Sequence, residues 1–300
     1  MSEPLPGVER QPDAMKRIAV EGGEVATYSF GTGTEVLLLA NGGPGLPCDY
    51  LRDSHSHLAD KDWRVVTWDQ LGVGRSDRPN DMSLWTIERY ARELEAVRTG
   101  LGLGRVHLLG QSWGGWLAIE YAVTFPDGIK SLVLSNTAGD LPHLVLELNR
   151  LRSALGTETV TMMLRREAEG TIGHPEYKAA VELLNWRHVH RMEAIPPALR
   201  RSIDGMVFDI YNVMQGPNEF VYSGNLKNWN RIPDMHRIEA PTLIIVGEHD
   251  ELTPACAMRM HQVLPASRIH VFPNCSHSTC FEDPQAYFDV LEGFLAENRG

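Results

Sequence analysis

Short apolar runs alternate with longer amphipathic segments along most of the chain. The runs are rich in β-branched residues and too short for helices, which is typical of strands buried on both faces of a parallel sheet. They lie at Glu35–Ala40, Arg64–Trp68, Val106–Leu109, Ser131–Ser135, Pro241–Gly247 and Arg268–Phe272. Two more strands, Lys16–Val20 and Val25–Phe30, enclose a glycine-containing turn and predict an opening hairpin. Amphipathic helices are predicted at Leu84–Leu101 and Pro284–Ala296, so the pattern indicates an α/β fold with a mostly parallel central sheet flanked by helices.

From Gly139 to Asn230 the pattern changes, because apolar residues recur at helical spacing and no buried strand is indicated. Helical segments are predicted around Leu144–Leu155, Val160–Glu169, Glu176–Arg191 and Ala198–Met214. A helical insertion between the strands of an α/β sheet is typical of a lid or cap. We therefore expect a helical cap domain at residues 139–230, inserted after the sixth strand, and a core domain formed by residues 1–138 and 231–300.

Composition narrows the class of protein. With 300 residues and 43% hydrophobic content, the chain can bury one large core, and no apolar run approaches the length of a membrane span. The formal net charge of −11 argues against nucleic acid or an anionic membrane as a partner. Met1–Gln11 lacks an apolar signal segment, so we expect a cytoplasmic protein. The four cysteines lack the spacing of a zinc site, which predicts reduced thiols.

One glycine-rich turn carries the first candidate for chemistry. The apolar strand stops at Gly110 and a helical pattern begins at Trp113, so Ser112 lies in a strand–turn–helix segment of the form Gly-x-Ser-x-Gly. This context is that of a nucleophile elbow, in which a strained turn holds the serine hydroxyl above the sheet. The free N–H groups of the following helical turn can hold an oxyanion. We expect Ser112 to be a nucleophile; the alternative is a serine in an ordinary glycine-rich turn.

A serine nucleophile needs a base, and the base needs an acid that orients it. In a parallel sheet such residues occupy loops at the carboxyl ends of strands. Asp250 follows the strand at Pro241–Gly247, and His277 follows the strand at Arg268–Phe272. The order Ser112, Asp250, His277 is the order of catalytic triads in the α/β-hydrolase fold. We expect acyl transfer to water, with His277 as the base and later the acid, and with Asp250 as its orienting carboxylate.

Other residues with catalytic potential fit this plan less well. His249 lies nearer to the acid, but it shares the loop of the acid and has no strand end of its own. His188-x-His190 and His55-x-His57 do not share a helix face and lack a carboxylate at ligand spacing, so no metal is expected. Gly72-x-Gly74 lacks the third glycine and the helix start of a dinucleotide fingerprint, so no organic cofactor is expected either.

Four motifs together carry a resemblance to a known family. They are Asn41-Gly-Gly-Pro-Gly45, Asp69-Gln-Leu-Gly-Val-Gly-Arg-Ser76, Gly110-Gln-Ser-Trp-Gly-Gly115 and Gly247-Glu-His-Asp-Glu251. Over nearly its whole length, including the lid segment Gly216-Pro-Asn-Glu-Phe220, the chain resembles the proline iminopeptidases. These are α/β-hydrolase aminopeptidases grouped with the tricorn-interacting aminopeptidase and L-amino acid amidases. In one departure, Asn41 replaces the histidine that family members usually have before Gly-Gly-Pro-Gly, which affects hydrogen bonding behind the loop.

The resemblance implies further site residues. It assigns the oxyanion hole to the backbone N–H groups of Gly43 and Trp113, as expected for one donor after the nucleophile and one from the Gly/Pro loop. It also implies that Glu219 in the lid and Glu251 beside the acid bind a free α-ammonium group of the substrate. The side chain of Trp113 is expected to line the acyl pocket. Without the resemblance, Glu219 would be interpreted as a solvated lid carboxylate and Glu251 as a surface residue in a turn.

We therefore predict a serine hydrolase that releases an N-terminal proline or small apolar residue from short peptides or amino acid amides through an acyl-enzyme. The predicted substrate carries a free amino terminus, and the sequence indicates no oligomeric state. A carboxylesterase or lactonase of the same fold is one alternative. A hydrolase-fold binding protein with vestigial chemistry is another, disfavoured because all three triad positions are filled.

Overall fold

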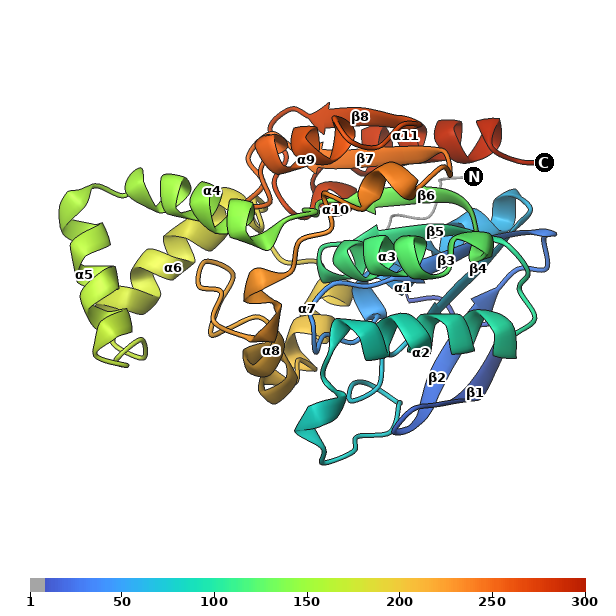
Figure 1. Ribbon diagram of the computed structural model, residues 1–300, viewed down its shortest axis with the longest axis horizontal. Helices are drawn as coiled ribbons and strands as arrows, with labels where there is room; N and C mark the ends of the chain where they lie inside the picture. The colour runs from blue at the N-terminus through green and yellow to red at the C-terminus, as the bar shows by residue number, and fades with distance from the viewer. Residues whose placement is uncertain (1–8) are drawn as a thin grey trace.

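The computed structural model describes residues 9–300 and contains one eight-stranded sheet (Figure 1). Its strands are β1 (Ala14–Val20), β2 (Gly23–Phe30), β3 (Glu35–Ala40), β4 (Trp63–Trp68), β5 (Val106–Gln111), β6 (Ile129–Ser135), β7 (Thr242–Gly247) and β8 (Ser267–Phe272). Their order across the sheet is β1-β2-β4-β3-β5-β6-β7-β8. The pairs β1–β2 and β2–β4 are antiparallel, and all the other pairs are parallel. The predicted hairpin and mostly parallel sheet are confirmed.

Side chains of the central strands alternate between two buried layers. In β3, Leu38 belongs to the layer with α2 (Ile87–Gly100), α3 (Trp113–Thr124) and α9 (Pro254–His261). Its neighbours Leu37 and Leu39 belong to the opposite layer, with α1 (Asp49–His55) and α11 (Pro284–Glu297). Because helices cover both faces, the central strands consist of continuous apolar runs. The parallel arrangement also brings the carboxyl ends of β3, β5, β6, β7 and β8 to the same edge of the sheet. The site lies at this edge.

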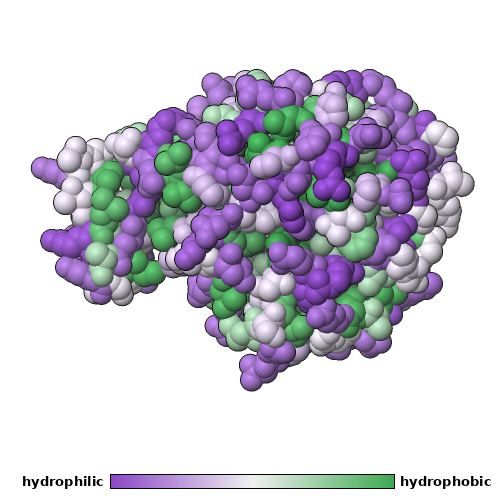
Figure 2. All heavy atoms as spheres, viewed as in Figure 1, coloured by the Kyte–Doolittle hydropathy of each residue, from purple (hydrophilic) through white to green (hydrophobic). Residues whose placement is uncertain are grey.

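Five α-helices lie between β6 and β7. They are α4 (Leu141–Ser153), α5 (Thr157–Ala168), α6 (Pro175–His188), α7 (Pro197–Asp204) and α8 (Phe208–Met214). Helices α4 to α6 extend from the sheet as an arm, whereas α7 and α8 lie against the core (Figure 1). Apolar side chains interrupt the hydrophilic surface of the arm (Figure 2), and Leu146, Leu164 and Trp186 are exposed there. The predicted helical insertion after the sixth strand is confirmed.

The segment predicted as one helix at Ala198–Met214 is in fact two helices, so this prediction was wrong. Helix α7 ends at Asp204 with Gly205 as its C-cap, and the N–H of Val207 donates a 2.8 Å hydrogen bond to the carbonyl of Gly45 in the loop after β3. Near the other end of α7, the hydroxyl of Ser202 accepts a 3.0 Å hydrogen bond from the backbone N–H of Tyr50. Contacts with the core therefore set the break in the helix, and they attach α7 to α1.

Three predictions about the whole chain can be compared with the described part of it. Residues 1–8 lie outside that part, and with them most of the Met1–Gln11 stretch that was considered for a signal segment. No helix within residues 9–300 is long and apolar enough to cross a membrane. Cys48, Cys256, Cys275 and Cys280 are buried free thiols.

Candidate active site

Ser112 occupies a strained turn between β5 and α3. Its backbone has φ 59° and ψ −126°, a conformation that non-glycine residues rarely adopt. A Cβ atom on Gly110 would lie 2.1 Å from the carbonyl oxygen of Gly114, and one on Gly114 would lie 2.0 Å from the carbonyl oxygen of Ala40. Only glycine fits at these two positions, because the turn brings helix, strand and loop backbones into contact. The geometry is that of the predicted nucleophile elbow.

The structure brings His277 and Asp250 together at the ends of β7 and β8. Nδ1 of His277 lies 3.0 Å from Oδ1 of Asp250, and both residues are buried. Burial alone would lower the pKa of His277, but the charge of Asp250 and its hydrogen bond outweigh burial and raise this pKa above 6.5. No hydrogen bond within residues 9–300 joins the hydroxyl of Ser112 to His277; Nε2 of His277 instead lies 3.2 Å from Nε2 of Gln111. Triad hydrogen bonds are often long before a substrate is bound.

Asn136 is a site residue that the sequence did not indicate. It follows β6 at φ 51°, and its Nδ2 donates to Oδ2 of Asp250 at 2.8 Å and to the carbonyl of Ser276 at 3.1 Å. Oδ1 of Asp250 also accepts the N–H of Leu252 at 2.9 Å. Both oxygens of the acid are therefore held by donors, which orients the carboxylate toward His277. An asparagine at the end of a buried strand, beside the insertion point of the cap, was the available signal.

The loop after β3 presents one backbone donor to the site. The N–H of Gly42 donates to the hydroxyl of Tyr50 at 2.6 Å, whereas the N–H of Gly43 donates to no other group within residues 9–300. Gly43 lines the same cavity as Ser112. The N–H of Trp113, in the first turn of α3, has no intrahelical partner. These two donors are the ones predicted for the oxyanion hole, and that assignment stays a prediction.

Asn41 holds this loop from behind. Its Nδ2 donates to the carbonyl of Leu46 at 2.7 Å and to that of Gly42 at 3.0 Å, so one side chain spans the turn. Gln70 donates from Nε2 to the carbonyl of Asn41 at 3.2 Å and accepts the indole N–H of Trp113 at 2.9 Å. Asparagine at this position thus supports the backbone through amide hydrogen bonds.

The side chain of Trp113 packs in the core. It is fully buried, with its ring centroid 5.6 Å from that of Tyr90 and 6.1 Å from that of Trp116, both in edge-on contacts. It is not among the residues that line the cavity at Ser112. Because its indole N–H is used on Gln70, the contacts of this side chain support the oxyanion loop. The indole was predicted to line the acyl pocket, but its contacts place it in the core behind the oxyanion loop.

Three polar side chains near Asp250 interact electrostatically with one another, namely Glu219, Glu251 and Tyr222. Glu219 accepts the hydroxyl of Tyr211 at 2.8 Å and Nε2 of Gln215 at 2.9 Å, and it lines the cavity at Ser112. Oε1 of Glu251 lies 3.2 Å from Nδ1 of His277, but that N–H donates to Asp250. Consequently both oxygens of Glu251, and the hydroxyl of Tyr222, are buried without a hydrogen-bond partner among the described residues.

The surroundings of Glu251 make its charged form unfavourable. Burial raises the pKa of Glu251 well above its usual value, and the negative charges of Asp250 and Glu219 raise it further. Burial also raises the pKa of Tyr222, and the negative charges of Glu219 and Glu251 raise it further. Unpartnered buried polar groups are rare and call for a physical reason. The unpartnered oxygens of Glu251 and Tyr222 are acceptors of the kind that a cation requires. Glu219 lines the cavity at Ser112, whereas Glu251 and Tyr222 are not among its lining residues.

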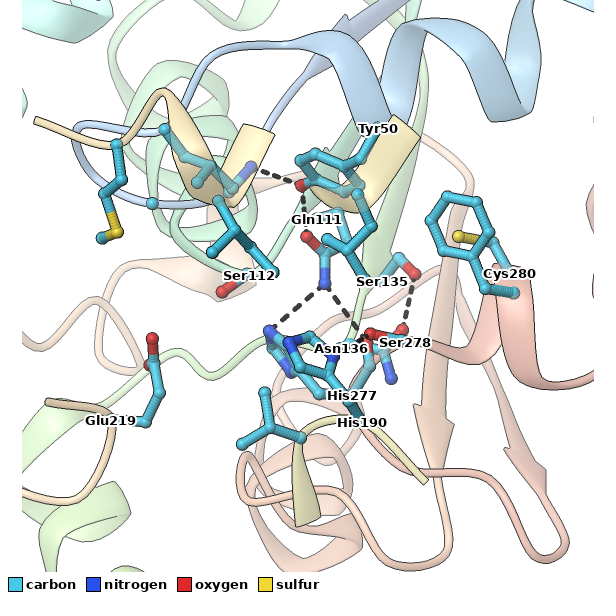
Figure 3. A pocket seen from close by; sticks show the side chains of 18 residues that line it. Tyr50, Gln111, Ser112, Ser135, Asn136, His190, Glu219, His277, Ser278 and Cys280 are labelled. Carbon is cyan, nitrogen blue, oxygen red and sulfur yellow. Dashed lines mark hydrogen bonds between the residues drawn. The ribbon is translucent and has the colours of Figure 1, made fainter. Parts of the chain in front are cut away.

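A cavity of about 110 Å³ opens at Ser112. In Figure 3, Glu219 lies on one side of Ser112 and His277, and Tyr50 and Cys280 lie on the other. Apolar side chains from α7 and from α10 (Thr279–Glu282) also line it, namely Leu199, Ile203 and Phe281. The cavity therefore has an anionic group at one end, Ser112 in the middle and an apolar wall.

The alternative residues have other contacts. His249 is half-exposed, and its nearest ionic partner is Glu248 at 3.8 Å. Nδ1 of His188 lies 2.8 Å from the carbonyl of His249, and Nδ1 of His190 lies 2.7 Å from the hydroxyl of Ser278. The only cluster of potential metal ligands within residues 9–300 is Asp250, Glu251 and His277, two of which are the predicted acid and base.

The Gly72-x-Gly74 turn wraps around a side chain. Oδ2 of Asp69 accepts the N–H of Arg75 at 2.9 Å and the hydroxyl of Tyr28 at 2.6 Å. A Cβ atom on Gly74 would lie 2.2 Å from this carboxylate. The glycine thus allows close approach of the turn to Asp69.

Comparisons with known proteins identify the family of this chain. Residues 35–284 match the family model for the alpha/beta hydrolase fold. The proline iminopeptidase of Heyndrickxia coagulans is 38% identical over 93% of this chain and 97% of its own. The crystal structure of the proline iminopeptidase of Mycobacterium smegmatis superposes with a TM-score of 0.88 at 33% identity, covering 95% of this chain and 98% of that one. The crystal structure of VinJ superposes with a TM-score of 0.90 at 30% identity, covering 96% and 100%. The chain therefore belongs to the proline iminopeptidase family of α/β-hydrolase enzymes.

Proposed function

We propose that this protein is a serine aminopeptidase that releases an N-terminal proline, or another small apolar residue, from short peptides or amino acid amides. The observation that carries the proposal is the pair of buried, unpartnered carboxylate oxygens of Glu251 beside His277. A neutral acyl group would leave them without a partner, whereas a substrate ammonium group supplies both charge and hydrogen-bond donors. This argues against the carboxylesterase and lactonase alternatives.

The reaction uses the triad in two half-reactions. Ser112 Oγ adds to the substrate carbonyl carbon as its proton passes to Nε2 of His277, and the oxyanion is held by the N–H groups of Gly43 and Trp113. Collapse breaks the carbon–nitrogen bond, and His277 gives its proton to the leaving amine. A water molecule then attacks the acyl-enzyme with His277 again as base, which restores Ser112. Asp250 stabilises the imidazolium throughout.

Recognition of the free amino terminus rests on three acceptors. Glu219, Glu251 and the hydroxyl of Tyr222 suit the two N–H donors of a prolyl ammonium or the three of a primary one. Each charge-assisted hydrogen bond contributes roughly 1.5–3 kcal/mol. A bound ammonium also offsets the repulsion that raises the pKa of Glu251, so binding favours the ionised carboxylate.

The leaving group follows from the position of the ammonium. With the ammonium at Glu219, the rest of the peptide extends past Ser112 toward Leu199 and Phe281, on the side from which His277 delivers the proton. The apolar wall of the cavity at Ser112 is formed by Leu199, Ile203 and Phe281. We infer a preference for peptides with an apolar second residue. Residues 139–230 act as a cap that limits substrate length over the core formed by 1–138 and 231–300.

Replacing the nucleophile tests the reaction. Ser112→Ala is expected to lower kcat by about 10⁶ if the triad acts as a unit. The exposed Ser153→Ala is the matched control. A serine-directed phosphonate should label the wild type and Ser153→Ala but not Ser112→Ala; retention of activity in Ser112→Ala would refute the acyl-enzyme, and absence of any labelling would favour vestigial chemistry.

Replacing an ammonium acceptor tests the specificity. Glu219→Gln is expected to lose roughly 10- to 100-fold in kcat/KM on free-amine substrates, the value of one charge-assisted bond, and to change little on N-blocked esters. An equal loss on both classes would remove Glu219 from amine recognition.

A further inference from the structure

A buried chain of hydrogen bonds connects the oxyanion loop to His277 without passing through Ser112 (Figure 3). The N–H of Gly42 donates to the hydroxyl oxygen of Tyr50 at 2.6 Å, and that hydroxyl lies 2.5 Å from Oε1 of Gln111. Nε2 of Gln111 then lies 3.2 Å from Nε2 of His277. Tyr50, Gln111 and His277 are only 4%, 7% and 8% exposed, so these groups depend on one another for partners.

The direction of each bond is fixed by its first donor. A backbone N–H can only donate, so the oxygen of Tyr50 accepts from Gly42 and its own proton goes to Gln111. Gln111 must therefore present its carbonyl oxygen to Tyr50 and its NH₂ group to His277. The carbonyl of His277, 3.3 Å from Nε2 of Gln111, requires the same orientation. A flipped amide would bring two oxygens together and leave the proton of Tyr50 without an acceptor.

A consequence follows for the tautomer of His277. Nε2 faces an amide donor and must carry a lone pair, while Nδ1–H donates to Asp250. We propose that Gln111, oriented by Tyr50 and Gly42, is a positioning residue that holds His277 in the proton-accepting tautomer and disfavours its doubly protonated form. After proton transfer from Ser112, the new Nε2–H would face the amide donor of Gln111, which favours passing the proton to the leaving amine. The proposal rests on His277 being the base in the proposed function.

The amide opposes several charges that favour the imidazolium. The titratable groups that face His277 come from the loop after β7, the cap and α10, and they are Asp250, Glu251, Glu219, His190 and Glu282. The carboxylates of Asp250, Glu219 and Glu282 raise the pKa of His277, whereas Gln111 contributes a donor at the nitrogen that would be protonated. Replacing the amide of Gln111 by a carboxylate would therefore favour the imidazolium of His277, whereas the amide disfavours it.

The test measures inactivation by a small amine-free fluorophosphonate as a function of pH. Ser112 Oγ attacks phosphorus, fluoride leaves and the proton goes to His277, so the acidic limb of the rate reports this base and needs no amine recognition. Gln111→Glu is expected to move the limb to higher pH by about one unit, and Tyr50→Phe by about half a unit, the size of a hydrogen bond of ordinary strength. The exposed Gln262→Glu, with the same charge change, should leave the limb in place.

An unchanged limb in Gln111→Glu, with a rate lowered equally at all pH values, would overturn the proposal and indicate a structural role. If Gln111→Glu does not fold by circular dichroism, the limb in Tyr50→Phe decides by the same criterion. Failure of amine specificity would refute the proposed aminopeptidase without affecting this readout. Loss of all labelling in the wild type would instead refute the triad.

Discussion

Nδ2 of Asn136 lies 2.8 Å from Oδ2 of Asp250, on the carboxylate oxygen opposite the one that holds His277. The two residues come from the ends of neighbouring parallel strands, β6 and β7, so sheet register sets this distance. The positive φ of Asn136, 51°, suits an asparagine better than most other side chains at this position. The bond fixes the plane of the acid against the imidazole.

Removing this donor should lower the rate of the chemical step. Asn136→Ala leaves Oδ2 of Asp250 buried without its amide donor, and we expect kcat to fall roughly 10- to 100-fold, the value of a hydrogen bond to a charged group, with little change in KM. Steady-state kinetics on an L-prolyl arylamide would check this. The exposed Asn212→Ala is the matched control. An unchanged kcat would show that Leu252 and His277 suffice to orient the acid.

We expect the carboxylate of Glu251 to destabilise the substrate-free protein at neutral pH, although it is proposed to bind the ammonium group of the substrate. Because burial and neighbouring charges raise its folded pKa above the ordinary 4.5, its contribution to stability is present below pH 4.5 and is lost as pH rises through the raised value. Without substrate, Glu251→Gln should therefore be more stable than the wild type by about 1 kcal/mol, or roughly 2 °C in Tm, at pH 8. The difference should shrink toward pH 5. Thermal unfolding at several pH values measures it.

The exposed Glu193→Gln is the control for this comparison and should show no such trend. A Glu251→Gln protein that is less stable than the wild type at pH 8 would mean that the carboxylate has a partner in the folded protein. The same variant should lose activity on free-amine substrates, so stability and function should change in opposite directions.

The apolar wall of the cavity predicts selectivity for the second residue of the substrate. Prolyl-leucine should be cleaved with a kcat/KM at least about 10-fold above that of prolyl-aspartate, the lower range for one apolar group in a pocket. Leu199→Ala should reduce this ratio and leave prolinamide, whose leaving group is ammonia, unchanged. Leu164→Ala, on the exposed arm, is the control. Equal rates on both dipeptides in the wild type would mean that the leaving group does not contact Leu199.

The sequence could predict the parts of the site that depend on local structure or on strand order. Ser112 was identified from its own turn, and Asp250 and His277 from their places after buried strands, because parallel strands present such loops at one edge. Asn136 could not be identified this way, since its importance depends on a contact with Asp250, 114 positions away. Tyr222 and Gln111 likewise gain meaning only from the groups that face them across the cap and the loop.

Two further differences have the same cause. The indole of Trp113 was expected in the acyl pocket, but its N–H donates to Gln70 in a different loop, 43 positions away. The break of the predicted helix at Gly205 depends on Gly45, which the sequence pattern around α7 does not contain. Periodicity predicts that a segment is helical, whereas tertiary hydrogen bonds decide where the helix ends.

The most direct test of the central claim compares hydrolysis of L-prolyl and L-alanyl arylamides and amides with that of their N-acetylated counterparts by the wild-type enzyme. Acetylation removes the positive charge that Glu219 and Glu251 are proposed to bind, while the scissile bond, Ser112 and the leaving group stay the same. We predict cleavage of the free-amine substrates and a loss of at least about 100-fold in kcat/KM on acetylation, since two charge-assisted bonds are removed. Equal or faster cleavage of the acetylated substrates would contradict the account and identify a serine hydrolase that does not recognise an amino terminus.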